Sequence, residues 1–290
     1  MRRTDMTARR RPGPEAGAGS SCRLWVGTSG YSYTQWVEVG FYPAGTRPGQ
    51  MLSWYARTFP ATELNTTWYQ MPRAEALERQ CREAPDNFLF TVKLNRGLTH
   101  DIDPDQWRDR AAAYRHGIAP LVQSGRLAAV LVQLPPGFDR SVANRRHLAG
   151  LLDELEGLPL AVEFRQGSWN TDRVFAELER RGVTLVAVDE PELPGLFPAL
   201  DVVTNPDLFY VRFHGRNAKG WRQAGTQFQF DYDYPEVELR DWVEHRIARL
   251  ARRARRGVIF FNNHVRAQAP RNARTMMRLL REHGYVLAAP

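Results

Sequence analysis

The stretch LAVEFRQGSWNTDRVFAELERRGVTLVAV, residues 160–188, contains a complete strand–helix–strand unit. Two apolar runs, Leu160–Phe164 and Val183–Val188, enclose an amphipathic segment that begins at Thr171 and ends against Gly182. Thr is a common N-cap residue, and Gly is the commonest residue just after the last turn of a helix. Apolar runs on either side of a helix are typical of parallel strands that are buried on both faces.

The same alternation continues along the rest of the chain. Apolar, β-rich runs are predicted as strands at Arg23–Thr28, Ala61–Thr66, Phe88–Leu94, Ala128–Leu134, Leu160–Phe164, Val183–Val188, Leu208–Phe213 and Gly257–Asn262. Between them, helical periodicity is clearest over residues 141–156, 171–181 and 235–256. Four prolines interrupt residues 189–207, which predicts a short or missing sixth helix.

Eight such units in about 265 residues match the size of a (β/α)₈ barrel. No GxGxxG turn follows the first strand, which disfavours an open doubly wound sheet. We therefore predict an α/β protein: a single TIM-type barrel over residues 22–290, with an irregular or short sixth helix. Residues 1–21 are rich in Arg, Gly, Pro and Ala and have no apolar period, so we predict a disordered basic tail there.

Composition limits the location and the partners of the protein. The net charge is +8, which favours an anionic small molecule or nucleic acid as partner, although Arg-rich composition alone could produce it. Cys22 and Cys81 show no metal-binding or disulfide pattern, as expected for a reducing compartment. The apolar runs are too short to span a membrane. We expect a cytoplasmic protein without a membrane partner, and the sequence does not indicate its oligomeric state.

The active site of a TIM barrel lies at the C-terminal ends of its strands. Strand alternation turns Glu163 and Arg165 into the lumen, and likewise Arg212 and His214. The same reasoning adds a further set of polar side chains: Glu63, Asn65, Lys93, Gln133, Asp189, Asn262 and His264. Burying charge in a lumen is costly unless the charge is paired or used. This pattern favours a functional site over ion pairs that serve only packing, such as Glu163 with Arg165 or Arg212.

Small and aromatic residues occur in the loops at the same end of the strands. The turn Gly27–Gly30 could bring backbone N–H groups close to a ligand, with Ser29 among them. The aromatic residues are predicted to form a rim that stacks a sugar or a base: Tyr31, Tyr33, Trp36, Trp68, Tyr69, Phe138, Trp169 and Trp221.

Ordered motifs along the chain resemble a known family. They are GTSGY at 27–31 with Trp36 and FYP at 41–43, ELNT at 63–66, FTVK at 90–93, QLPP at 133–136, EFR at 163–165 with Ser168–Trp169, RFHGR at 212–216, FNN at 261–263, and Asn272–Ala273. Together they resemble the family called domain of unknown function 72, or YecE-like. Trp68 stands where that family usually has Phe, and Ala267 where it has Gly. The resemblance implies a TIM barrel and leaves the reaction open.

Three functions fit these residues. The first is an enzyme, in the hydrolase class, acting on a phosphorylated small molecule or a nucleic-acid phosphodiester. His214 would then be the general acid/base, assisted by Glu163 and Glu63. The substrate would contact Ser29, Tyr31, Asn65, Lys93, Gln133, Arg165, Trp169, Arg212, Arg216, Asn262 and Asn263. We expect Glu163→Gln and His214→Ala to abolish activity while leaving stability near that of the wild type.

The remaining hypotheses use parts of the same site. No cofactor is indicated, and a divalent metal is a less favoured addition, with Glu63, Asp189, His214 and His264 as candidate ligands. Arg165 and Arg212 would compete with the metal for these carboxylates. The second function is glycoside hydrolysis by Glu63 and Glu163. The third is non-catalytic nucleic-acid binding through the basic tail, the Arg-rich helix predicted over residues 235–256, and the aromatic rim.

Overall fold

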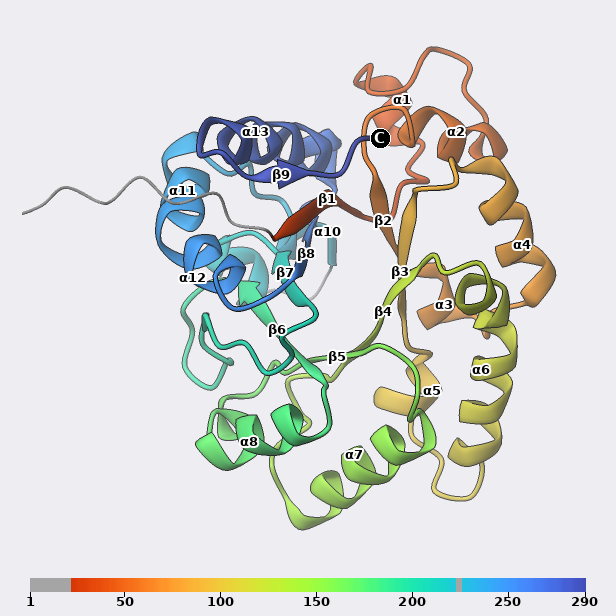
Figure 1. Cartoon of the computed structure of the whole chain (residues 1–290), viewed down its shortest axis with the longest axis vertical. Coiled ribbons are helices and arrows are strands. Elements are labelled where there is room, and N and C mark those ends of the chain that lie inside the picture. Colours follow the sequence, from red (N-terminus) through yellow and green to blue (C-terminus); the bar gives the residue numbers. More distant parts are fainter. Residues whose placement is uncertain (1–21, 223–225) are drawn as a thin grey trace, which may run out of the picture.

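A computed structural model describes residues 22–222 and 226–290, and its strands form a closed barrel (Figure 1). The barrel strands are β1 (Arg23–Ser29), β2 (Ala61–Leu64), β3 (Leu89–Lys93), β4 (Leu127–Gln133), β5 (Leu160–Glu163), β6 (Thr184–Asp189), β7 (Phe209–Phe213) and β8 (Arg256–Phe261). Each strand is parallel to its neighbours, and β1 pairs with both β2 and β8, which closes the ring. The predicted (β/α)₈ barrel is confirmed.

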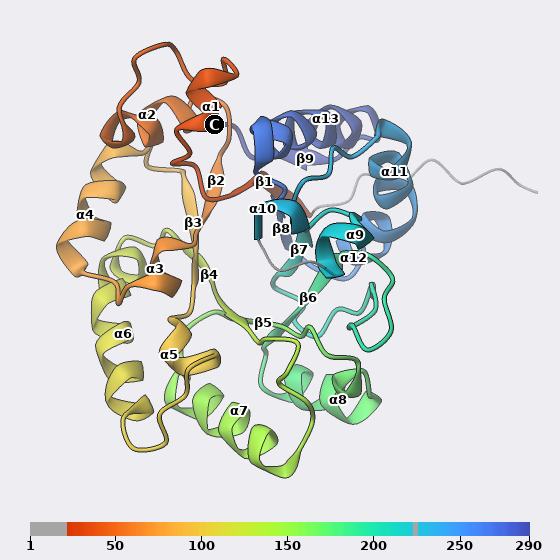
Figure 2. The same ribbon diagram turned by 180° about the vertical axis from the view of Figure 1, so that it is seen from behind.

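Helices surround the strands in both views of the ribbon (Figures 1 and 2). They are α1 (Gln35–Glu38), η1 (Pro48–Gln50), α2 (Met51–Tyr55), α3 (Thr66–Tyr69), α4 (Ala74–Glu83), α5 (Arg96–Thr99), α6 (Trp107–Gln123), α7 (Val142–Glu154), η2 (Gly167–Trp169), α8 (Asp172–Arg180), α9 (Ala218–Arg222), α10 (Thr226–Gln229), α11 (Glu236–Asp241), η3 (Trp242–Ile247), α12 (Ala248–Ala251), η4 (Val265–Ala267) and α13 (Gln268–Glu282). Residues 190–208, all of them described, contain no helix, so the sixth helix is missing as the prolines predicted.

The predicted caps and the last long helix can be compared with the structure. Ser141 caps α7 by accepting from the Asn144 N–H, and Thr171 caps α8. The helix predicted over residues 235–256 is too long, because helical structure ends at Ala251 after one π-helical segment, η3. Past that point the Arg255 N–H donates to the Pro206 carbonyl at 2.8 Å, which aligns the chain to begin β8.

The core has an outer and an inner layer. The outer layer lies between strands and helices, and the inner layer fills the lumen with side chains at alternate strand positions, including Ala129, Leu131, Val186, Val188, Tyr210, Val258 and Phe260. Close packing in the outer layer depends on Gly117 of α6, where a Cβ would lie 2.2 Å from the Pro72 carbonyl oxygen. Gly150 of α7 has more room, since the nearest atom to its Cβ would be 3.4 Å away.

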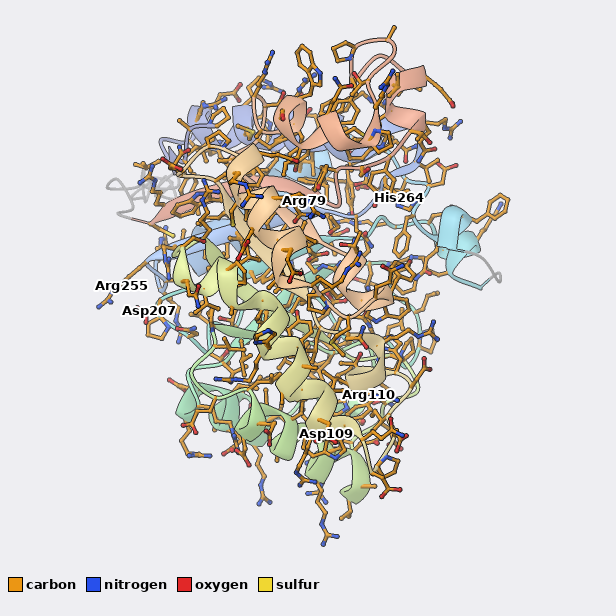
Figure 3. All side chains as sticks on the ribbon, turned by 90° about the vertical axis from the view of Figure 1, so that its right-hand side faces the viewer. Arg79, Asp109, Arg110, Asp207, Arg255 and His264 are labelled. Atoms are coloured by element: carbon orange, nitrogen blue, oxygen red, sulfur yellow. The ribbon has the colours of Figure 1, made fainter. Side chains whose placement is uncertain are left out.

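The two ends of the barrel differ. At the N-terminal end, β9 (Val286–Leu287) pairs with the start of β1. Asp207 and Arg255 form a 2.9 Å ion pair at this end, and Figure 3 shows them on the side opposite His264. His264 follows β8 and therefore marks the mouth, the C-terminal end. In the part of the chain that the structure describes, no helix has the length and apolarity needed to cross a membrane.

Candidate functional site

Glu163, at the end of β5, is the centre of a buried cluster of charges. Its Oε1 accepts from Arg165 Nε at 2.5 Å, and its Oε2 accepts from Arg212 Nη1 at 2.6 Å. His214 Nε2 lies 3.2 Å from Oε1. Glu163 and His214 are fully buried, and Arg165 and Arg212 are 6% and 2% exposed. Strand alternation on β5 and β7 points all four side chains into the lumen, as predicted.

Hydrogen bonds extend the cluster in two directions, to Glu63 on β2 and to Glu190 just after β6. Arg212 Nη2 donates to Glu63 Oε1 at 2.6 Å, and the Tyr210 hydroxyl donates to Glu63 Oε2. On the other side, Arg165 Nη1 donates to Glu190 Oε2 at 2.8 Å. We call Glu63, Glu163, Glu190, Arg165 and Arg212 the charge network; in it carboxylates and guanidinium groups alternate across the lumen.

The charge network determines the protonation of its members. Burial of Glu163 opposes ionisation, but Arg165 and Arg212 hold the pKa of this carboxyl well below its usual range. Burial raises the pKa of Glu190 to about 7, because Arg165 offsets only part of the desolvation. Burial, with Arg165 adding to it, holds the pKa of His214 well below its usual range, so the imidazole is neutral near pH 7.

His214 does not have a free ring nitrogen to serve as general base. His214 Nε2 lies 2.9 Å from Arg165 Nη2 and 3.2 Å from Glu163 Oε1, so it faces both members of the Glu163–Arg165 ion pair. His214 Nδ1 faces the side-chain amide of Asn262 at 3.2 Å. The three predicted catalytic residues, Glu163, Glu63 and His214, each contact Arg165 or Arg212. They therefore position these two guanidinium groups.

A cavity of about 780 Å³ opens above the charge network, and we call it the mouth cavity. Its basic lining residues are Lys93, Arg165 and Arg212. Its amide and imidazole lining residues are Asn65, Gln80, Gln133, Gln229, Asn262, His100 and His264. Its aromatic lining residues are Tyr31, Tyr33, Trp68, Tyr69, Trp221 and Phe230. No Asp or Glu is among the described residues that line it, because the carboxylates of the charge network lie below.

Lys93 lies at the end of β3, where hydrogen bonds fix its backbone carbonyl, and its ammonium group has no acidic partner among the described residues. Its carbonyl accepts from the Thr67 hydroxyl at 2.6 Å and from the Tyr114 hydroxyl at 3.2 Å. Nζ lies 4.8 Å from the centre of the Trp68 ring, and no hydrogen bond or ion pair joins it to any residue that the structure describes. Burial, with a further effect of the Arg212 charge, lowers the pKa of Lys93 to about 7.

Aromatic rings form the walls of the mouth cavity. The Tyr33 and His264 rings stack at 4.9 Å, and Arg165 lies 5.2 Å from the centre of the Trp221 ring. Burial lowers the pKa of His264, and it lowers that of His100 to about 4, with the nearby Lys93 adding to the effect. Both imidazoles are therefore neutral near pH 7.

The structure brings most of the predicted site residues together. Tyr31, Asn65, Lys93, Gln133, Arg165, Arg212, Asn262 and His264 line the mouth cavity. Ser29 lies lower, with its hydroxyl 3.5 Å from Arg212 Nη2. Four other predicted residues, Asp189, Arg216, Asn263 and Trp169, lie outside the cavity.

Asp189 was assigned to the wrong face of β6. Val186 and Val188 fill the lumen, so Asp189 faces the helices, where Trp242 Nε1 donates to it at 2.6 Å and the Tyr234 hydroxyl also donates at 2.6 Å. Arg216 pairs with Asp189 at 2.6 Å and therefore does not reach the mouth cavity.

Asn263 and Trp169 belong to the outer layer of the core. Asn263 Nδ2 donates to the Tyr232 carbonyl and to Asn272 Oδ1, both at 2.7 Å, which ties the end of β8 to α13. Trp169 stacks on Phe164 at 4.8 Å, and its indole N–H donates to the Phe138 carbonyl. Trp36 and Phe138 of the predicted aromatic rim are buried in this layer as well.

The four candidate metal ligands are not assembled into a site. Asp189 faces away from the lumen, Glu63 is bound by Arg212 and Tyr210, and His264 stacks on Tyr33. Over residues 22–222 and 226–290, no group of three or more His, Cys, Asp and Glu side chains is arranged to hold a metal ion.

Two residues of the site were not predicted, although the sequence contained the signal for both. Glu190 and Tyr210 occupy the lumen positions that strict alternation from Val188 and Arg212 requires. Tyr210 Oη also lies 2.9 Å from the Thr91 hydroxyl, so it links β7 to β3 and to Glu63. His100, which follows α5 and lines the mouth cavity, was not predicted either.

Comparison with known protein families shows to which family the chain belongs. The family model described as protein of unknown function DUF72 matches residues 25–290. The chain belongs to this family. UPF0759 protein YunF of Bacillus subtilis is 28% identical over 271 residues, which cover 89% of this chain and 94% of YunF. UPF0759 protein YecE of Escherichia coli K12 is 26% identical over 57% of this chain and 59% of YecE.

Solved structures of DUF72 proteins have the same fold. A DUF72 family protein from Thermotoga maritima superposes with a TM-score of 0.80 at 35% identity, covering 89% of this chain and 99% of the other. One from Enterococcus faecalis gives 0.80 at 27% identity, covering 89% and 95%. These relatives confirm the family resemblance and the barrel, and their names carry no activity or substrate.

Proposed function

We propose that this DUF72 protein is an enzyme that binds a small anionic molecule in the mouth cavity. The observation that carries the proposal is the charge of the lining, which has Lys93, Arg165 and Arg212 but no carboxylate among its described residues. Arg212 Nε also has no hydrogen-bond partner among the described residues. Guanidinium and ammonium groups of this kind favour phosphate or carboxylate oxygens.

Catalysis, rather than binding alone, is supported by the protonation states at the mouth. Lys93 lines the mouth cavity, and burial lowers its pKa from that of an ordinary lysine to about 7. Groups that titrate near the working pH can exchange protons with a substrate. Such displacements, at the C-terminal mouth of a barrel, are typical of enzyme active sites.

The size of the mouth cavity favours a small molecule over a nucleic acid. A volume of about 780 Å³ is in the range of sites for cofactor-sized ligands, and the Trp68 and Trp221 rings can stack a flat or apolar part of such a ligand. Two arginines of the helix predicted over residues 235–256 already pair with carboxylates, Arg249 with Asp201 at 2.8 Å and Arg255 with Asp207 at 2.9 Å.

Glycoside hydrolysis has less support from the same geometry. Both carboxylates proposed for it, Glu63 and Glu163, are bound to Arg212 and fully buried beneath the lining of the cavity. A retaining or inverting glycosidase needs two carboxyl groups that reach the bond to be cleaved.

The test is a ligand screen by thermal shift and isothermal titration with inorganic phosphate, sugar phosphates, α-keto acids, neutral sugars and a double-stranded oligonucleotide. We expect an anionic small molecule to bind the wild type, and Lys93→Met to weaken binding by about tenfold or more. Arg181→Met, just after α8 and outside the mouth cavity, is the control and should bind normally. Preference for a neutral sugar, or salt-sensitive binding of the oligonucleotide alone, would overturn the proposal.

A further inference from the structure

Lysine is rare in this chain, and its two positions are informative. Of the 40 Lys and Arg residues only Lys93 and Lys219 are lysines, and the other 38 are arginines. Lys219 is exposed on α9. The chain therefore uses arginine for almost every cationic role, including both guanidinium groups of the charge network. A guanidinium keeps its proton at any physiological pH, so only lysine can present a neutral amine at the mouth.

The surroundings of Lys93 suit an amine that reacts rather than one that forms ion pairs. The carboxylates closest in the lumen, Glu63 and Glu163, are each held by guanidinium groups of the charge network. The Trp68 face covers one side of the amine, and the lining of the mouth cavity leaves another side open to a ligand. The hydrogen bonds to the Lys93 carbonyl hold the backbone from which the side chain extends.

We propose that Lys93 is a nucleophile that forms an imine with the carbonyl group of an aldehyde or ketone substrate carrying a phosphate or carboxylate group. The requirement for an anionic group rests on the proposed function, whereas the reactivity of Lys93 does not. Arg165 and Arg212, which line the same cavity, would face the anionic group.

The chemistry balances without any further reagent. The lone pair of the neutral Nζ forms a bond to the carbonyl carbon, and the π electrons of the C=O bond move to oxygen, which takes up a proton as the nitrogen loses one. The hydroxyl group of the carbinolamine then takes up a proton from solvent and leaves as water, while the nitrogen lone pair forms the C=N bond of a protonated imine. The protonated imine can accept the electron pair of a bond that breaks at the adjacent carbon, so aldol cleavage, decarboxylation and dehydration are the reaction classes implied.

The protonation state of Lys93 agrees with this role. With a pKa lowered to about 7, about half of its amines are neutral near pH 7. An ordinary lysine has only about one neutral amine in 2,500 at that pH. Since a less basic amine is also intrinsically less nucleophilic, we expect Lys93 to react roughly 10- to 100-fold faster than an ordinary surface lysine.

The experiment is reductive trapping of the intact protein near neutral pH. Glyceraldehyde 3-phosphate is the anionic probe, glycolaldehyde is the uncharged probe, and sodium cyanoborohydride reduces any imine to a stable secondary amine. Intact mass and peptide mapping then locate the adduct. Lys93→Arg keeps a cation and should lose the adduct at the mouth, whereas Lys219→Arg should keep it.

The possible results separate this inference from the proposed function. Adduct at Lys93 that forms at least tenfold faster than at Lys219, and faster still with the phosphorylated probe, supports both. Rapid adduct at Lys93 with no preference for the phosphorylated probe supports imine formation and contradicts the anionic substrate. Phosphate binding without faster trapping at Lys93 than at Lys219 overturns the imine and leaves the proposed function standing.

Discussion

Replacing Glu163 with Gln tests whether the charge network supports the barrel. The substitution keeps the size of the side chain and removes its charge. In the wild type, the Glu163 carboxylate accepts from Arg165 at 2.5 Å and from Arg212 at 2.6 Å. A carboxamide has one accepting oxygen and a donating NH₂, so one guanidinium group would face another donor inside the lumen.

The magnitude follows from burial. Glu163 is fully buried, and removing one partner of a buried ion pair costs about 3–5 kcal/mol because the remaining charge is left uncompensated. This is a large part of the 5–15 kcal/mol that is typical of a whole domain. The sequence led us to expect that Glu163→Gln would leave stability near that of the wild type. Because of these contacts, we now expect the substitution to destabilise the fold.

Urea unfolding followed by circular dichroism measures the effect, and Glu177→Gln is the matched control. Glu177 also binds two arginines, Arg180 at 2.7 Å and Arg181 at 2.6 Å, but on the surface of α8. Surface pairs contribute about 0–1 kcal/mol, so the control should lie close to the wild type. If Glu163→Gln lost no more stability than Glu177→Gln, the charge network would not stabilise the fold and the reasoning would fail.

Three further tests examine separate features. Gly117→Ala should lower the free energy of unfolding in urea by about 1–3 kcal/mol, because the added Cβ would meet the Pro72 carbonyl. Gly150→Ala should raise it by about 0.5–1 kcal/mol. Effects of the same sign for the two variants would contradict the packing described for α6. Tyr210→Phe should cost about 1–3 kcal/mol by leaving Glu63 Oε2 without its donor, and a neutral effect would rule out that role. The pKa of Glu190 is raised to about 7 in the folded state, so the folded protein binds more protons than the unfolded chain between pH 4.5 and 7, and stability falls as pH rises through this range. Glu190→Gln should make this fall smaller when unfolding is measured as a function of pH. An unchanged pH profile would contradict the raised pKa of Glu190.

Much of the fold could be predicted from the sequence because each strand is a compact apolar run. Each predicted strand overlaps its observed strand with ends that agree within two residues, for example Leu160–Phe164 for β5. The missing sixth helix could also be predicted, since proline cannot donate the hydrogen bonds that a helix needs. The end of the helix before β8 could not, because the arginines after Ala251 continue a helical pattern while hydrogen bonds from Arg255 set the strand.

The candidate site was predicted less completely, and β6 shows why. Polarity at the end of that strand suggested Asp189, but alternation from Val186 puts Glu190 in the lumen and Asp189 among the helices. Sequence spacing also cannot tell a carboxylate that lines a cavity from one that lies beneath it. Glu163 and His214 are in the lumen as predicted, yet Arg165 and Arg212 lie between them and the mouth cavity.

The long reach of the charge network along the chain has a consequence for the order of folding. Glu63 and Arg212 are 149 positions apart, so their ion pair forms only when the first and last parts of the chain meet. Contacts of such high sequence separation are slow to form, and they add little to a transition state built from neighbouring units. We therefore expect the charge network to assemble after the rate-limiting step. Weakening it should accelerate unfolding while leaving the refolding rate nearly unchanged, which makes the closed ring a determinant of kinetic lifetime.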